Sequence, residues 1–490
     1  MGASAGDAGR RGLKEFGALR ERILKGPVYR TLAWLAWPVI IVNLVNLSYN
    51  LVDAIWLGRL GKVAFSAPTV CWPPIMFVYS LALGYASAAI SLISQYAGAG
   101  DVEMVRKSAG QLVTFAAAFG LSISAVGFAT APYILSLMSV PPKVYPLAVT
   151  YMRIIFAGAP AVIPAFAYIT ISNSLGDTKT PMKLNVASSI ANIVLDPILI
   201  FGLLGLPRLG VAGAAIATIA SRSWVSAAGL YILFVRGVKG LRLGRDDLRI
   251  EGWWVRKVFK IGTPLAIQRS STALGFTVLM SLVSRFGSSV IAAFGVAQRV
   301  INILQAFAGG FFRASSIMIG QAIGAEEYLR AKEVVRKALT LITLGFTVGS
   351  ALIVVFREQL ILAFVNSPSV VPIGSELLEI FAPSIPFFGM FFLCSAVANG
   401  SGHTKFFAVI SIIRLWVIRV GLGTLLAFTL GLGVNGIWYA LTMGNVVAGL
   451  IALTWLFRGT WLKRVIEVPQ RAAAIPASRV GADGVGKAGG

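Results

Sequence analysis

Apolar stretches of about twenty residues recur along the chain between Ala33 and Leu456, and short polar segments separate them. Each stretch is long enough to cross a hydrocarbon layer of about 30 Å as an α-helix. They do not alternate apolar and polar residues, as the strands of a membrane β-barrel do. The pattern predicts twelve membrane-spanning helices, over residues 33–57, 66–96, 108–136, 146–172, 183–205, 210–235, 259–283, 291–321, 335–364, 374–398, 407–430 and 434–457.

Composition supports an all-α integral membrane protein embedded in a lipid bilayer. Of the 490 residues, 57% are hydrophobic and only 13% are charged. A soluble globular protein carries about 25% charged residues. Glycine and proline inside the apolar stretches are tolerated in membrane helices, where neighbouring helices satisfy the freed backbone groups.

The positive charge of the chain lies mainly on one side of the predicted helices. The net charge is +24, from 43 Lys and Arg against 19 Asp and Glu. With the termini and every second loop taken as one side, 30 basic residues fall there and six in the opposite loops. Such asymmetry is typical of cytoplasmic loops, so both termini are expected in the cytoplasm of a plasma-membrane protein. The charge therefore does not indicate a nucleic-acid partner.

The two halves of the chain repeat each other. A shift of 226 residues superimposes four pairs: Pro38 with Pro264, Gly61 with Gly287, Gln95 with Gln321, and Gly98 with Gly324. Six helices per half return the chain to the same side, so the halves are parallel repeats related by a pseudo-two-fold axis along the membrane normal. Such an architecture predicts a central cleft and alternating access by rocking of the bundles.

These features divide the chain into five predicted parts. Residues 1–32 form a basic cytoplasmic N-terminal segment, 33–235 an N-terminal six-helix bundle, 236–258 a cytoplasmic linker, and 259–457 a C-terminal six-helix bundle. Residues 458–490 form a cytoplasmic tail, which is expected to be disordered because it becomes rich in Ala, Gly and Pro without periodicity. We expect the protein to act as a monomer.

Two carboxylates lie deep in predicted helices, Asp53 in the first and Asp196 in the fifth. Glu379 lies nearer the start of the tenth. An ionisable residue at membrane depth costs about 2.5–3.5 kcal/mol on insertion scales, and such residues usually serve transport. The second half has Leu279 in the position of Asp53, so the carboxylates belong to the first half.

Polar side chains accompany both carboxylates at helical spacing. Asn43, Asn46, Asn50 and Asp53 follow one another at intervals of three, four and three, which places them on one face beside Tyr49. The set expected to converge inside the first bundle also holds residues of three further helices: Tyr151, Asn192, Asp196 and Thr218.

This set predicts an ion-coupling site formed by Asp53, Asp196, Asn192, Thr218 and Tyr49, with Asn46, Asn50 and Tyr151 lining the cavity. Two carboxylates in a low-dielectric pocket cannot both ionise cheaply, so the pair can load and release a proton. Oxygens of Asp53, Asn192, Asp196 and Thr218 are also suitable ligands for Na⁺ as a transported ion. H⁺ and Na⁺ both stay open, and no bound cofactor is expected.

Five arginines lie within or near helices of the second half: Arg269, Arg299, Arg313, Arg414 and Arg419. They either pair with backbone carbonyl groups or face the cleft, and the sequence leaves both interpretations open.

Catalytic motifs do not account for these residues. The chain has no Gly-x-x-x-x-Gly-Lys-Ser/Thr loop for nucleotide phosphates and no His-Glu-x-x-His motif. Its one histidine, His403, gives little from which to build a catalytic triad. The sequence predicts a secondary transporter and not an enzyme.

Several segments resemble the multidrug and toxic compound extrusion (MATE) family across about residues 30–460. They are Pro38 with Tyr49-Asn-Leu-Val-Asp53, the pair Gln95 and Gln321, Asn173-Ser-Leu-Gly-Asp-Thr-Lys-Thr-Pro181, Asn192-Ile-Val-Leu-Asp-Pro197 and Gly210-Val-Ala-Gly213. The resemblance implies a multidrug exporter that exchanges small organic, mainly cationic, compounds for H⁺ or Na⁺. It is closest to the DinF-like branch, which implies that Asp53 and Asp196 bind the coupling ion and that the first helix bends at Pro38.

Two alternatives stay open. A flippase for lipid-linked sugars or polysaccharide precursors, from the same superfamily, is favoured by the second-half arginines but disfavoured by the count of twelve helices. A membrane scaffold that transports nothing would leave Asp53 and Asp196 without a role.

Overall fold

The chain folds into two helical lobes in a computed structural model that describes residues 2–467, with side chains described from Lys14 onward. A helix, α1 (Gly2–Lys25), precedes the lobes. The N-terminal lobe consists of α2 (Val28–Arg59), α3 (Lys62–Ala99), α4 (Val102–Leu137), α5 (Tyr145–Ala157), α6 (Ala159–Ser174), α7 (Lys179–Phe201), α8 (Val211–Tyr231) and the π-helical end η1 (Ile232–Arg236).

The C-terminal lobe begins after a short 3₁₀ turn, η2 (Asp246–Leu248). It consists of α9 (Gly252–Ser284), α10 (Ser288–Gly324), α11 (Tyr328–Val355), α12 (Arg357–Leu362), α13 (Val371–Phe381), η3 (Ala382–Ser384), α14 (Ile385–Ser401), α15 (Thr404–Ile412), two π-helical segments η4 (Ile413–Leu422) and η5 (Leu425–Thr429), and α16 (Gly433–Arg458).

The twelve predicted membrane spans are confirmed as helices. Ten continuous spans are long and apolar enough to cross a bilayer, and the pair α5 and α6, bent by 52° at Gly158, is an eleventh. The twelfth is α9, which is more polar because Arg256, Lys257, Lys260 and Arg269 lie along it. Each lobe therefore holds six spans.

The lobes meet at a quasi-symmetric contact between α3 and α10, which we call the interlobe junction (Gln95, Gly98, Gln321 and Gly324). The Gln95 amide nitrogen donates to the backbone oxygens of Gly400 and Ser401 at 3.2 and 3.0 Å. The Gln321 amide nitrogen donates to the backbone oxygen of Ser174 at 3.0 Å. These bonds show the pseudo-two-fold relation directly, because Ser174 stands 226 positions before Gly400.

Glycine at two positions allows the helices to approach this closely. A Cβ atom at Gly98 would overlap the carbonyl oxygen of Gln321, and one at Gly324 would overlap that of Gln95. The two contacts are images of each other under the repeat. Small residues at a helix crossing let backbones pack together, as in other membrane helix pairs.

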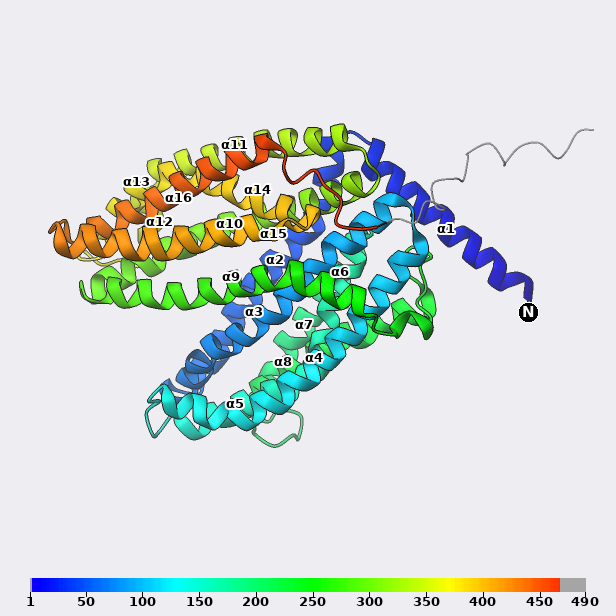
Figure 1. The fold of residues 1–490 in the computed structure, drawn as a ribbon. Coiled ribbons are helices and arrows are strands. Elements are labelled where there is room, and N and C mark those ends of the chain that lie inside the picture. The colour runs from blue at the N-terminus through cyan, green and yellow to red at the C-terminus, as the bar shows by residue number, and fades with distance from the viewer. Residues whose placement is uncertain (1, 468–490) are drawn as a thin grey trace, which may run out of the picture.

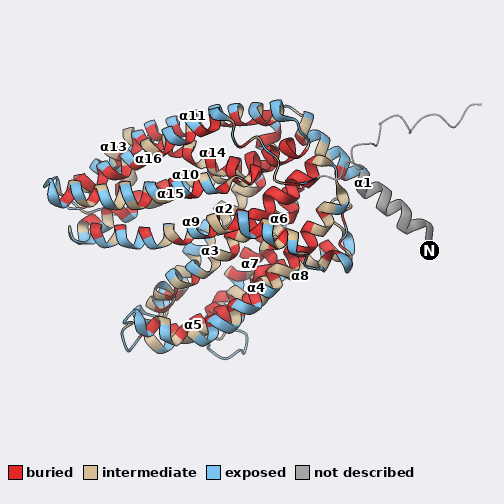
Figure 2. Ribbon diagram, in the orientation of Figure 1, coloured by how far each residue is buried: buried red, intermediate tan, exposed pale blue. Residues whose placement is uncertain are grey.

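Away from the junction the lobes diverge. In Figure 1 they separate toward the loops at 138–144 and 285–287, while α1 and the linker between the lobes lie at the other end. Figure 2 shows many buried residues in the central region of the view, around the labels α2, α6 and α14, and more exposed residues along the diverging parts. Helix α2 packs on α10, and α9 packs on α3, so the first helix of each lobe packs against the second helix of the other lobe.

The linker predicted over residues 236–258 is shorter than expected, because α9 begins at Gly252. Trp254 and Val258 give the start of α9 a fully buried face, and Trp254 packs against Phe115 of α4. The linker itself is fastened to α4 by an ion pair of 3.1 Å between Arg106 and Asp247.

The predicted C-terminal tail is packed up to residue 467. The backbone nitrogen of Val465 donates to the Gln95 side-chain oxygen at 3.1 Å, and Arg464 pairs with Glu326 at 2.6 Å. Residues 459–467 therefore bridge the two lobes beside the junction. The rest of the expected disordered tail, 468–490, lies outside the described residues.

Candidate functional site

The predicted polar residues of the N-terminal lobe converge where α2, α7 and α8 meet. Helix α7 packs against both α2 and α8. Asn192 and Asp196 lie one turn apart on the face of α7 that is buried between these neighbours. Asp53 on α2 lies close enough to Asp196 for their charges to interact, so the structure brings together the two carboxylates that the sequence singled out.

Asp196 is fully buried and has one side-chain partner. In the amide orientation that satisfies both of its polar ends, Asn192 donates to Oδ2 of Asp196 at 2.9 Å and accepts from the backbone N–H of Thr218 at 3.3 Å. Oδ1 of Asp196 and Oδ1 of Asp53 are buried without a hydrogen-bond partner among the described residues. A buried acceptor without a donor is costly, so both oxygens are free to take a proton or a cation.

Two tyrosines close the site. The hydroxyl of Tyr49 lies beside the Thr218 side chain, and both Tyr49 and Tyr151 lie near Asp53. Cys71, also near Tyr151, donates its thiol hydrogen to the backbone oxygen of Ala148 at 3.3 Å. The structure therefore places Tyr49 beside Thr218, and both tyrosines near Asp53.

The asparagines of α2 do not stay together. Asn43 donates to the backbone oxygen of Ala306 on α10 at 3.0 Å, so it fastens α2 to the other lobe. Asn46 faces α8 of its own lobe. Asn50 is exposed and forms no side-chain hydrogen bond within the described part of the chain. The three asparagines share one face of α2, yet each has different surroundings.

Sequence reasoning missed Arg222 of α8. Its Nη2 donates to Oδ1 of Asn46 at 3.4 Å, and its guanidinium lies 5.7 Å from the centre of the Tyr49 ring. A positive charge therefore stands at the edge of the carboxylate site. The signal was available, because Arg222 follows Thr218 by four residues and so shares its helical face.

Pro38, predicted to bend the first helix, is buried in α2. The helix runs without interruption from Val28 to Arg59. Because proline removes one backbone hydrogen bond, it is the weakest point of α2, and it lies on the part of α2 that contacts α10 near Gly310. Bending at Pro38 stays a prediction.

The chemistry available to this site is that of two carboxylates with hydroxyl and amide oxygens. No group of three or more His, Cys, Asp or Glu side chains able to hold a metal ion occurs in the described ranges. A transported Na⁺ ion would therefore need the neutral oxygens of Asn192 and Thr218 besides the two carboxylates.

The five second-half arginines have different surroundings. Arg299 is exposed and lies 5.9 Å from the Phe364 ring centre, and Arg269 and Arg313 face the protein interior without a carboxylate partner in the described structure. Arg414 and Arg419 share one acceptor, as described below. Glu379 pairs with Arg357 at 3.4 Å and is mostly exposed.

Comparison with known proteins explains this combination of fold and polar residues. The family model MatE matches residues 38–198 and 264–425, one match in each repeat. A probable multidrug resistance protein, YoeA of Bacillus subtilis, is 29% identical over 450 residues, which cover 90% of this chain and 96% of that protein. An FAD transporter of Shewanella oneidensis is 26% identical over 433 residues, 88% of this chain and 95% of that protein.

Solved structures share the fold over most of the chain. A crystal structure of MATE in complex with MaL6 is 25% identical, covers 90% of this chain and 98% of its own, and gives a TM-score of 0.84. An outward-facing conformation of a multidrug resistance MATE family transporter gives a TM-score of 0.83 at 24% identity, with the same coverage. The protein is a multi-span membrane transporter for small organic compounds and not an enzyme. The two matched repeats show that the chain belongs to the multidrug and toxic compound extrusion (MATE) family.

Proposed function

We propose that this transporter exports small organic compounds in exchange for H⁺ or Na⁺, with Asp53 and Asp196 as the coupling pair. The observation that carries this proposal is the meeting of the buried Asp196 with the half-buried Asp53, each with one buried carboxylate oxygen that has no partner among the described residues. Carboxylates at membrane depth mark ion pathways in transporters. The position of both acids in the N-terminal lobe favours the DinF-like branch of the family.

The coupling step follows from the donor set. With one carboxylate protonated, the pair carries a single negative charge and tolerates its low-dielectric surroundings. Loss of that proton creates two adjacent charges, which favours a return of the proton or entry of Na⁺. Asn192 holds Asp196 in place through its amide, while Thr218 and Tyr49 supply hydroxyl oxygens nearby.

The proposed transport movement is a rocking of the lobes that opens the interlobe junction and brings the lobes together at the opposite end. The divergence of the lobe backbones away from the junction supports this movement (Figure 1). Rocking to the opposite state breaks the amide hydrogen bonds of Gln95 and Gln321. Bending of α2 at Pro38 would couple the carboxylate site to this movement.

We also propose the orientation, the cellular location, the substrate charge and the oligomeric state of the protein. Lys and Arg are most frequent in the terminal segments, the linker and the loops on the same side. This asymmetry supports cytoplasmic termini and a plasma-membrane location. The carboxylate pair supports cationic substrates on the N-terminal side of the cleft. We infer that a single chain is the working unit, because both repeats needed for the cleft belong to it.

The proposal is tested with purified protein in liposomes, under a pH gradient and a Na⁺ gradient imposed separately. Efflux of ethidium, a cationic dye, is followed by fluorescence. One of the two gradients should drive transport by the unmodified protein, and Asp53→Asn or Asp196→Asn should abolish the gradient-driven part. Glu379→Gln, which removes an exposed acid far from the pair, is the matched control and should leave transport intact.

Unchanged gradient-driven efflux in both Asp variants would reject the coupling assignment. A lack of response to either gradient in the unmodified protein would reject secondary transport.

A second candidate, flipping of lipid-linked sugars or polysaccharide precursors, is favoured by the arginines of the C-terminal lobe. Such precursors carry phosphate groups, which guanidinium groups bind well. Liposomes that hold a fluorescent polyprenyl phosphate separate the candidates. Flipping of this lipid without ethidium efflux would favour the flippase.

A further inference from the structure

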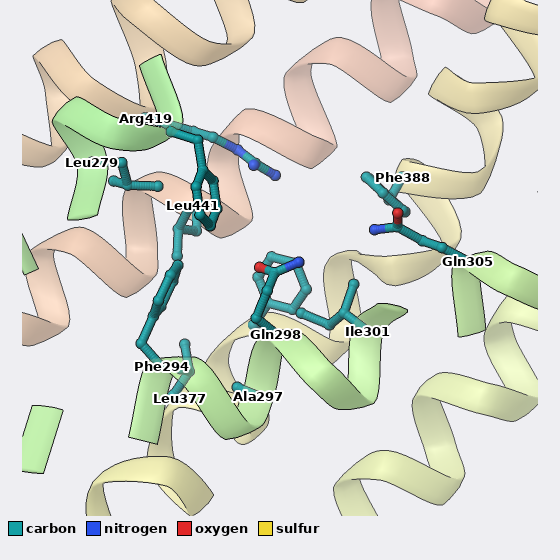
Figure 3. A pocket seen from close by; sticks show the side chains of 12 residues that line it. Leu279, Phe294, Ala297, Gln298, Ile301, Gln305, Leu377, Phe388, Arg419 and Leu441 are labelled. Atoms are coloured by element: carbon teal, nitrogen blue, oxygen red, sulfur yellow. The ribbon is translucent and has the colours of Figure 1, made fainter. Parts of the chain in front are cut away.

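A cavity in the C-terminal lobe contains polar groups that the coupling proposal does not use. It is lined by residues of α9, α10, α13, α14, η4 and α16, and it is partly open. Aromatic and aliphatic side chains form most of the wall. Figure 3 shows the guanidinium of Arg419 pointing into the space, with the amides of Gln298 and Gln305 on the other side.

Two arginines, Arg419 of the cavity lining and Arg414 next to it, converge on a single neutral acceptor. Nη1 of Arg414 and Nη2 of Arg419 donate to the same oxygen, Oδ1 of Asn445, at 3.0 and 2.7 Å. Asn445 is fully buried and is oriented by donating its amide hydrogen to Oγ of Ser384 at 2.8 Å. Hydrogen bonds to the asparagine oxygen therefore keep the two guanidinium groups close to each other, although their charges repel.

The π-helical geometry of η4 explains why both arginines reach one point. In a π-helix the backbone bonds join residues five apart, so residues at that spacing lie near one another along one face. Arg414 and Arg419 have this spacing. π-helical turns frequently occur at functional sites.

The described carboxylates do not balance these two charges. Neither Arg414 nor Arg419 has a carboxylate within 4.0 Å in the described structure, and their Nε atoms are buried without a hydrogen-bond partner. The acids of α13 are engaged elsewhere, since Glu376 accepts from Asn435 and Glu379 pairs with Arg357. A half-buried pair of like charges with unused donors favours an anion from outside.

The aromatic surroundings define the rest of the ligand. The guanidinium of Arg414 lies 5.4 Å from the ring centre of Phe388 and 4.3 Å from that of Phe391. Phe388 also lines the cavity, together with Phe276, Phe294 and Phe381. Such a wall binds a flat apolar body, and the arginine pair binds an attached oxyanion.

We propose that this cavity is a binding subsite for an organic anion, in which the Arg414–Arg419 pair holds a carboxylate or phosphate and the phenylalanines hold an aromatic or other apolar body. The proposal deepens the transport function and rests on it, because only a transporter that opens between its lobes needs a substrate site here. It gives the C-terminal lobe a ligand of opposite charge to that favoured by the carboxylates of the N-terminal lobe.

The test is an equilibrium binding measurement, which needs neither an ion gradient nor transport. Full-length protein in nanodiscs of phosphatidylcholine is titrated calorimetrically with three naphthalene probes of equal body: 1-naphthoate, 1-naphthylmethylamine and 1-naphthalenemethanol. We expect 1-naphthoate to bind about tenfold more tightly than the other two, because a hydrogen bond to a charged group is stronger than one to a neutral group. No preference, or a preference for the amine, in the unmodified protein overturns the proposal whatever the variants do.

Variants locate the site. Arg414→Gln and Arg419→Gln should each remove most of the preference for 1-naphthoate, whereas Arg299→Gln, an exposed arginine of the same lobe, should keep it. Equal binding in all three variants would overturn the assignment to this pair. The double variant Asp53→Asn, Asp196→Asn should bind 1-naphthoate normally, so failure of the coupling proposal and failure of this one are distinguishable.

The anionic group could belong to a soluble compound or to a lipid. In nanodiscs that contain phosphatidylglycerol, a lipid ligand should compete with 1-naphthoate and remain bound to the unmodified protein, but not to Arg419→Gln, in native mass spectrometry. Undiminished binding of 1-naphthoate in these nanodiscs assigns the site to soluble organic anions.

Discussion

At the scale of single residues, some members of the predicted N-terminal site contact a carboxylate and others do not. Asn192 and Asn50 have the same side chain and both belong to the predicted site. Asn192 is buried and bonds Asp196, whereas Asn50 is exposed. Helical spacing places each asparagine on the same face as a carboxylate of its own helix, but it does not show what neighbouring helices place against that face. This difference leads to a direct comparison of the two asparagines.

Asn192→Ala removes the amide that donates to the buried carboxylate of Asp196. We expect gradient-driven efflux to fall at least about tenfold and the free energy of unfolding to fall by about 1–3 kcal/mol, because a buried acceptor loses its donor. Asn50→Ala should change neither quantity. Liposome efflux and thermal unfolding in detergent provide the measurements, and equal behaviour of the two variants would contradict the role given to Asn192.

At the scale of elements, the crossing of α3 and α10 shows how much of the fold is fixed by small residues. The repeat of Gly98 and Gly324 was visible in the sequence, and it was attributed to duplication alone. The structure adds the cause, since each glycine admits the carbonyl oxygen of the other helix's glutamine. A sequence cannot show which helices cross, so the reason for these glycines was not predictable.

Gly98→Ala should destabilise the junction by about 1–3 kcal/mol, because its Cβ atom would overlap the carbonyl oxygen of Gln321. Gly345→Ala on α11, where a Cβ atom meets nothing within 4 Å, is the matched control and should be neutral or slightly stabilising. Intrinsic fluorescence during thermal unfolding measures both. Equal unfolding temperatures for the two variants would show that the crossing has room to relax.

The whole molecule combines symmetric architecture with asymmetric chemistry. The junction hydrogen bonds repeat across the pseudo-two-fold axis. The charged groups do not repeat, because Asp53 and Asp196 lie in one lobe and the Arg414–Arg419 pair lies in the other. The two lobes therefore hold charged groups of opposite sign.

The predicted orientation is testable on the whole molecule in intact cells. In a background with Cys71→Ala and Cys394→Ala, which removes the two cysteines of the sequence, single cysteines are introduced at Ser139 and at Lys239. A membrane-impermeant maleimide should label Ser139→Cys in intact cells and Lys239→Cys only after lysis, because basic loops stay in the cytoplasm. The reverse pattern would overturn the proposed orientation.

The sequence by itself determined the twelve helices, the duplication and the position of two carboxylates, Asp53 and Asp196, within membrane helices. These follow from local chemistry: a long apolar run must become a helix in lipid, and an acid within it stands out. The resemblance to the MATE family could also be recognised from the sequence, because it rests on short motifs.

Only the tertiary structure decided which polar groups meet. On a regular α-helix, Arg414 and Arg419 would lie about 140° apart, so nothing in their spacing indicated a pair. The π-helical turn of η4 and the buried Asn445 of α16 bring them together. Likewise Arg222 joins the carboxylate site through contacts between α2 and α8. Periodicity fixes the face of a helix on which a residue lies, but packing decides what that face meets.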